Sequence, residues 1–181
     1  MALTLAQISE YLSFNGLPWL LLAWASIYIF RPFATIIHEL GHAISAVIFT
    51  SQTVLIKVGV GQGSLNFSIK SLKLEISFKK MIFGYTAFQD ANLANIQLAL
   101  IYATGPIFSF LACTVGLWLI YTTSLHTALD ALLVGWVCSN LLCLLRNLLP
   151  LQLQVPGSNS VPSDGLQIVR IIMGKLPRDL N

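Results

Sequence analysis

The sequence predicts an α-helical integral membrane protein with three transmembrane helices and a membrane-associated β-hairpin or small sheet. The 181 residues are 56% hydrophobic and only 9% charged, with a mean hydropathy of +0.77, whereas soluble domains carry about 25% charged residues. The apolar residues are concentrated in long stretches, and a membrane-crossing helix needs about 20 of them. This composition excludes an ordinary cytosolic globule, a disordered chain and a secreted disulfide scaffold.

The first apolar stretch, residues 17–50, is longer than a simple crossing requires. As one helix it would be about 50 Å long, compared with a bilayer core of about 30 Å. Arg31 and Pro32 interrupt it, and proline removes a backbone donor and clashes with the preceding turn. We expect one kinked spanning unit with its break at Pro32. Two shorter helices that meet at this proline are the alternative.

Residues 52–89 have a different pattern. Apolar and polar residues alternate along 53–58 and 72–78, as they do in β-strands, and glycines such as Gly59 and Gly61 lie between the two segments. The region therefore predicts a hairpin or small sheet at the membrane surface.

The rest of the chain contains two further predicted spans, at 95–121 and 127–148. Residues 149–163 follow as a loop rich in Pro, Gly, Ser and Asn, and Asp164 opens a short helix that extends to about Met173. There is no internal repeat and no soluble accessory domain in the pattern. We therefore expect residues 1–181 to form a single membrane-embedded domain.

The distribution of basic residues predicts the orientation in the membrane. They gather in the hairpin region and in the C-terminal segment: Lys57, Lys70, Lys73, Lys79, Lys80, Arg170, Lys175 and Arg178. Three crossings put both regions on one side, and the positive-inside rule makes that side cytoplasmic. With no targeting extension visible, we expect a bacterial inner membrane and a site nearer its cytoplasmic face. The net charge of +3 is too small to suggest nucleic-acid binding.

The sequence His38-Glu39-Leu40-Gly41-His42 is the main indication of chemistry. Residues four apart lie on one helix face, so both imidazoles can hold one metal ion while the glutamate reaches a water molecule beside it. Zinc suits this ligand set and acidifies water, and Glu39 would act as the general base and acid. The alternative is a hydrogen-bonded polar cluster, although ionisable residues in a membrane helix are costly without a function.

A catalytic zinc needs a third protein ligand. Asp164 is one candidate, because the loop before it can return to the histidines, but Ser163-Asp164-Gly165 is equally typical of a helix N-terminus with an ordinary cap. His126 is a competing ligand, which we set aside because it falls on the opposite side of the predicted membrane.

Taken in order, these motifs resemble the site-2 protease family of intramembrane zinc metalloproteases. The likeness includes the His-Glu-x-x-His helix, the glycine-bearing hairpin, Gly105-Pro106 in the next span, Asn147-Leu148-Leu149-Pro150 and finally Asp164-Gly165. It extends from about residue 32 to residue 172. It implies a metalloprotease core of three transmembrane helices, in a minimal form without a PDZ domain.

The resemblance also implies roles for individual residues. His38, His42 and Asp164 match the family's zinc ligands, Glu39 its catalytic residue, and Asn147 an asparagine that helps hold the substrate backbone. The segment that contains Gly59 and Gly61 is similar to the family's membrane-associated sheet. An exposed strand edge there would pair with an unwound substrate strand.

One feature departs from the family pattern. Residues 151–163 separate Pro150 from Asp164, where the family usually has only a few residues. The loop is either a longer route to the metal, at small entropic cost, or it holds the aspartate away and leaves a two-histidine site.

The sequence thus favours an intramembrane zinc endopeptidase that cleaves single-pass membrane proteins. The expected partners are these substrates, the lipid bilayer, and a second copy of the chain or a regulatory membrane protein. A substrate filter of the PDZ type would then come from a partner. The alternative, motivated by the long loop, is a proteolytically inactive scaffold of the same fold that binds partner membrane proteins. A transporter is disfavoured, since transporters commonly show internal repeats and more spans.

Overall fold

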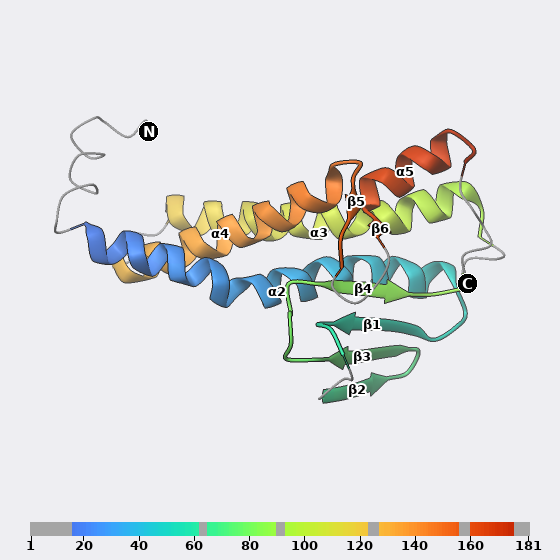
Figure 1. Ribbon diagram of the computed structural model, residues 1–181, viewed down its shortest axis with the longest axis horizontal. Helices are drawn as coiled ribbons and strands as arrows, with labels where there is room; N and C mark the ends of the chain where they lie inside the picture. Colours follow the sequence, from blue (N-terminus) through green and yellow to red (C-terminus); the bar gives the residue numbers. More distant parts are fainter. Residues whose placement is uncertain (1–15, 62–64, 90–92, 123–126, 156–159, 176–181) are drawn as a thin grey trace.

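The computed structural model describes residues 16–61, 65–89, 93–122, 127–155 and 160–175 (Figure 1). Its elements, in chain order, are α2 (Leu17–Phe49), β1 (Val54–Val58), β2 (Leu65–Ile69), β3 (Leu72–Ile76), β4 (Gly84–Ala87), α3 (Asn95–Thr122), α4 (Thr127–Leu148), β5 (Gln152–Leu153), β6 (Val161–Pro162) and α5 (Asp164–Ile172). Among the described residues, three helices, α2, α3 and α4, are long and apolar enough to cross a membrane. The three predicted spans and the short final helix are therefore confirmed as helices.

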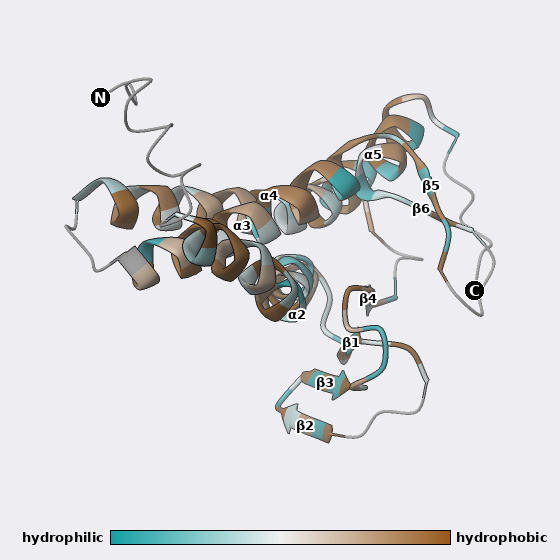
Figure 2. Cartoon of the chain, turned by 60° about the vertical axis from the view of Figure 1, so that its left-hand side comes forward, coloured by the Kyte–Doolittle hydropathy of each residue, from teal (hydrophilic) through white to brown (hydrophobic). Residues whose placement is uncertain are grey.

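The three long helices form a bundle in which α3 runs antiparallel to α2 and α4 (Figure 1). Small residues allow the close approach. A Cβ at Gly135 of α4 would collide with Ser26 of α2, and Ser26 Oγ donates to the Ala131 carbonyl at 3.3 Å. Large apolar side chains such as Trp24 and Trp118 are exposed, and hydrophobic residues predominate along the three long helices (Figure 2). Such a surface is typical of helices that face lipid.

Helix α2 continues through Pro32. A single continuous helix is thus confirmed, and both the expected break at Pro32 and the alternative of two shorter helices are wrong. Contacts with α4 hold the helix on both sides of the proline, and beyond it Cys143 Sγ donates to the Ala34 carbonyl at 3.9 Å. Ser139 Oγ donates to the Ile27 carbonyl at 2.8 Å, and the Ser139 carbonyl accepts from Arg31 Nη1 at 3.2 Å. Tertiary packing therefore outweighs the local cost of the missing backbone donor.

The predicted hairpin region forms a four-stranded sheet in the order β2-β3-β1-β4. The two segments predicted as strands, β1 and β3, pair in parallel, from Val54 with Leu72 to Val58 with Ile76. A simple hairpin between them is therefore wrong, and a small sheet is correct. The unpredicted strand β2 makes the antiparallel hairpin with β3, through a turn in which Lys70 has a φ of 50°. Strand β4 pairs antiparallel with β1.

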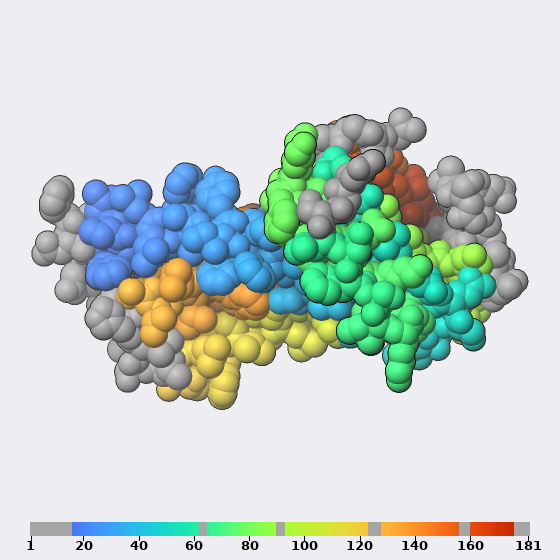
Figure 3. All heavy atoms as spheres, turned by 90° about the horizontal axis from the view of Figure 1, so that it is seen from below, coloured from blue at the N-terminus to red at the C-terminus, as the bar shows by residue number. Residues whose placement is uncertain are grey.

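The sheet is fixed to one end of the bundle by its apolar face. Val54, Ile56 and Val58 of β1 are fully buried, and they share a core with Ala43 of α2 and Ile101 of α3. Figure 3 shows the sheet covering this end of α2. Because β4 is the strand at the sheet edge beside α2, this packing sets β4 against the helix that carries the histidines.

Candidate metal centre

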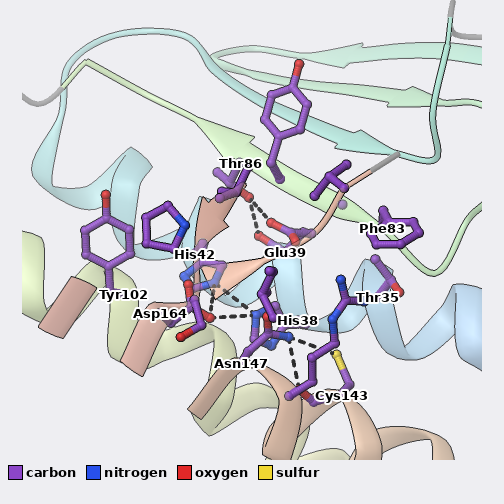
Figure 4. Close-up of a pocket in the computed structure, with 18 of the residues that line it drawn as sticks. Thr35, His38, Glu39, His42, Phe83, Thr86, Tyr102, Cys143, Asn147 and Asp164 are labelled. Carbon is purple, nitrogen blue, oxygen red and sulfur yellow. Dashed lines mark hydrogen bonds and ion pairs between the residues drawn. The ribbon is translucent and has the colours of Figure 1, made fainter. Parts of the chain in front are cut away.

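His38, His42 and Asp164 converge on one point, although 126 positions separate His38 from Asp164 (Figure 4). Asp164 Oδ2 lies 2.9 Å from His38 Nε2 and 3.3 Å from His42 Nε2. The two Nε2 atoms are 3.2 Å apart. Both histidines are buried within the bundle. Together the three side chains form a group that could hold a metal ion.

The spacing of these three atoms fits a tetrahedral zinc site. With bonds of about 2.0–2.1 Å, two ligands of a tetrahedral zinc lie about 3.3 Å apart. The observed separations of 2.9, 3.2 and 3.3 Å are close to this value. Two imidazole nitrogens and one carboxylate oxygen are also a donor set that zinc accepts, with a fourth position left for water or substrate.

Helix α3 orients both imidazole rings through their other nitrogens. His42 Nδ1 is 2.7 Å from the Ile101 carbonyl, and His38 Nδ1 is 3.0 Å from Ser109 Oγ. Because a carbonyl only accepts, His42 carries its proton on Nδ1, and its Nε2 lone pair faces Asp164 and His38. Such outer partners fix the tautomer and orientation of metal-binding histidines.

The long loop delivers Asp164 to the histidines because it folds back on itself. Strands β5 and β6 pair antiparallel within it, and the ends of the loop are tied together. Ser163 N donates to the Leu151 carbonyl at 2.9 Å, and Ser163 Oγ donates to the Leu149 carbonyl at 2.6 Å. The described parts of the loop, residues 151–155 and 160–163, thus form a ribbon that leaves Asp164 close to the end of α4. Of the two routes left open by the sequence, the longer loop that reaches the site is confirmed.

The residue that caps α5 is Ser163. Its hydroxyl accepts from Leu166 N at 3.2 Å, and Asp164 is the first residue of the helix. The alternative that Asp164 is an ordinary N-cap is therefore wrong. Burial alone would raise the pKa of the Asp164 carboxyl, but the adjacent His42 and His38 more than offset this effect and lower it to about 2. The carboxylate is thus present as an anion, the form that binds metal.

Glu39 is buried beside the histidines, under strand β4. Thr86 Oγ1 of β4 is 2.8 Å from Glu39 Oε2 and donates to it (Figure 4). A Cβ at Gly84 would collide with the Glu39 side chain, so this glycine lets β4 lie directly on α2. The strand therefore holds the carboxylate in place while leaving it at the cavity.

A cavity of about 230 Å³ connects these groups. Glu39, both histidines, Asp164 and Asn147 line it. Asn147 Nδ2 donates to the Cys143 carbonyl of its own helix at 3.0 Å. The volume exceeds that of one water molecule, about 30 Å³, so the cavity has room for water together with a piece of substrate.

Two predicted residues, Gly59 and Gly61, lie outside the cavity. Gly59 and Gly61 have φ values of 89° and 105° and form the turn after β1, which does not line the cavity. The Gly59 N–H donates to the Phe83 carbonyl at 2.8 Å, just before β4. A substrate-binding role for the two glycines stays a prediction. His126 lies outside the described residues.

Several residues that support the site were not identified from the sequence. Ser109 and Thr86 are single hydroxyl residues on other elements, and no local pattern marks them. Gly105 offered a signal, because Gly-Pro inside an apolar span often permits close packing. A Cβ at Gly105 would collide with the His42 ring, so the glycine makes space for a candidate ligand.

Comparison with known proteins does not assign the chain to a family. A scan of the chain against protein-family models found no match, and a search of curated proteins found no matching sequence. The function is therefore inferred from the site itself.

Proposed function

We propose that this chain is an intramembrane zinc endopeptidase of the site-2 protease type, which hydrolyses peptide bonds in single-pass membrane proteins. One observation carries the proposal. The His38, His42 and Asp164 donors meet in a cavity that also contains the Glu39 carboxylate, within a bundle of apolar helices. Polar groups are costly in such surroundings unless they are paired or functional.

The residues present can carry out each proton transfer of peptide hydrolysis. When bound by the two histidines and Asp164, zinc would supply the Lewis acidity that makes water nucleophilic and polarises the peptide carbonyl. Glu39 then accepts a proton as the water oxygen bonds to the carbonyl carbon. It returns this proton to the amide nitrogen as the C–N bond breaks, which releases an amine and a carboxylic acid.

Strand β4 is the element best placed to present a substrate. It pairs with β1 along one edge, and no described strand pairs with its other edge. Residues 84–86 also line the cavity. An unwound substrate segment could therefore add to this edge through main-chain hydrogen bonds, with its scissile bond near Glu39. Asn147, on the facing helix α4, would hold the substrate backbone from the other side.

The arrangement of the elements supports a site near the cytoplasmic face. The sheet and α5 lie at the same end of the bundle, and the start of α2 lies at the other (Figure 1). The sheet end carries lysines such as Lys57 and Lys73, which the positive-inside rule places in the cytoplasm. We therefore propose a multi-pass protein of the bacterial inner membrane, with its cavity toward the cytoplasmic side.

No observation now favours the inactive scaffold. Its motivation was a loop that might keep Asp164 from the metal, whereas the β5–β6 ribbon leaves Asp164 Oδ2 2.9 Å from His38 Nε2. We therefore propose the endopeptidase alone.

Cleavage by the purified protein in lipid vesicles tests the proposal. We expect hydrolysis of co-reconstituted single-pass peptides within their apolar segment. Treatment with 1,10-phenanthroline should stop the reaction and one equivalent of zinc should restore it, because the structure offers one three-ligand site among its described residues. Product masses from mass spectrometry give the cut positions. Failure of zinc-loaded protein to cleave any member of a diverse peptide set would contradict the proposal.

A further inference from the structure

Two arginines line the same cavity as Glu39, and neither has a role in the proposed hydrolysis. Arg31 belongs to α2, two turns before His38, and Arg146 belongs to α4, next to Asn147. Arg31 Nη1 donates to the Ser139 carbonyl at 3.2 Å, and Arg146 Nη1 donates to the Ile82 carbonyl at 3.1 Å. Each guanidinium has five N–H donors, so these contacts use only a small part of its capacity.

Neither arginine has an acidic partner among the described residues. The ion pairs found there join Asp164 to the two histidines and Lys57 to Glu75. Glu39 and Asp164 are the carboxylates that line the cavity, and neither forms an ion pair with an arginine. Both arginines are half-buried, and two like charges that share one cavity repel each other unless an anion joins them. Among the described residues, no carboxylate therefore forms an ion pair with either arginine, and a bound anion could do so.

The arginines belong to the end of the cavity that lies away from Asp164. Arg146 stacks over the Phe83 ring, 4.6 Å from its centroid. Arg31 lies one turn before Thr35 on α2, and its Nη1 donates to the Ser139 carbonyl of α4. In Figure 4, Phe83 and Thr35 lie on one side of Glu39, and Asp164 and Tyr102 lie on the other. The cavity thus has a metal-binding end and a cationic end, with the carboxylate of Glu39 between them.

We propose that the cationic end, formed by Arg31 and Arg146, is a specificity subsite that binds a carboxylate of the peptide substrate. The carboxylate is either an acidic side chain or the C-terminal carboxylate. This inference rests on the proposed endopeptidase function. A peptide is the favoured occupant because the cationic end is continuous with Glu39 and with the open edge of β4. Guanidinium groups also match carboxylates through paired N–H donors.

The helix geometry gives the position of the carboxylate in the substrate. Arg31 precedes His38 by seven positions, so their backbones lie about 10 Å apart along the helix. An extended peptide covers about 3.3 Å per residue. We therefore expect the carboxylate about three residues from the scissile bond.

The test uses three dye-labelled apolar peptides of about 20 residues that differ at one position. The first carries a single Glu and an amidated C-terminus, the second carries Gln instead, and the third carries Gln with a free C-terminal carboxylate three residues from the expected cut. Binding to zinc-loaded, detergent-purified Glu39→Gln protein is measured by fluorescence anisotropy. Cleavage is measured with the wild-type protein.

We expect one carboxylate peptide to bind at least about tenfold more tightly than the Gln amide, as charged hydrogen bonds typically allow. The peptide that does so identifies the source of the carboxylate. The preference should disappear when Arg31→Gln or Arg146→Gln is added. It should persist with Arg170→Gln, which removes a cation of α5 that does not line the cavity.

The outcomes separate this inference from the proposed function. Equal binding of all three peptides to the zinc-loaded protein overturns the subsite, even if the wild type cleaves them. A carboxylate preference without cleavage by the wild type supports the subsite and contradicts the endopeptidase. Equal peptide binding, combined with loss of co-purifying phosphatidylglycerol in Arg31→Gln, assigns the arginines to a lipid phosphate and also overturns the subsite. The peptide comparison needs no arginine variant, so a misfolded variant does not affect it.

Discussion

Glu39→Gln is expected to reduce peptide hydrolysis by at least about a thousandfold, which is within the range for loss of a general base. The amide has nearly the shape of the carboxylate, so it can still accept from Thr86 Oγ1, which lies 2.8 Å from Glu39 Oε2. It cannot accept a proton from water or return one to the leaving nitrogen. Zinc binding should remain, because the metal ligands are His38, His42 and Asp164.

Single-turnover cleavage and zinc content, measured on the same preparation, check this expectation. Glu75→Gln is the matched control, since Glu75 lies on β3 in an ion pair with Lys57 and outside the cavity. It should cleave at the wild-type rate. Wild-type cleavage by Glu39→Gln would show that another group carries the proton.

Gly105→Ala is expected to weaken zinc binding by at least about tenfold, the usual cost of disturbing the partners that orient a ligand. The added methyl group would collide with the His42 ring. The His42 ring cannot move far, because its Nδ1 is held 2.7 Å from the Ile101 carbonyl. Ile101 lies one turn before Gly105 on α3. Either that hydrogen bond breaks or α3 moves away from α2, and both changes misplace the Nε2 atom.

Zinc titration with a competing chelator measures this loss, and circular dichroism checks that the helices remain. Ile107→Ala is a control on the same turn of α3, since Ile107 is 48% exposed and points away from the core. It should bind zinc as the wild type does. If Gly105→Ala had wild-type affinity, the position of His42 in this structure would not be the one that holds the metal.

The parts of this structure that follow from local patterns were predictable from the sequence. Long apolar runs gave the three helices to within a few residues, because hydrophobic length is a local property. The pair His38 and His42 shares a helix face for the same reason. The order of motifs also favoured Asp164 as a metal ligand, although residue chemistry alone favoured a ligand and an ordinary helix N-cap equally.

The remaining features depend on contacts between distant residues. Strand β2 was missed because its exposed residues pair only with β3, and strand pairing is decided by neighbours rather than by the segment alone. Thr86 and Ser109 reach the site only after β4 and α3 have packed on α2. The closure of the long loop was equally hidden, because it depends on Ser163 meeting Leu149 and Leu151.

Zinc content of the detergent-purified protein, compared with His42→Ala, Asp164→Ala and Asp130→Ala, tests the central claim most directly. Asp130 lies in the first turn of α4, at the opposite end from Asn147, and its removal should leave the metal in place. The three-ligand site predicts about one zinc per chain in the wild type, lost in both the His42 and Asp164 variants while each remains folded. Full zinc retention by Asp164→Ala would contradict it, because the metal would then be held without the residue that completes the site.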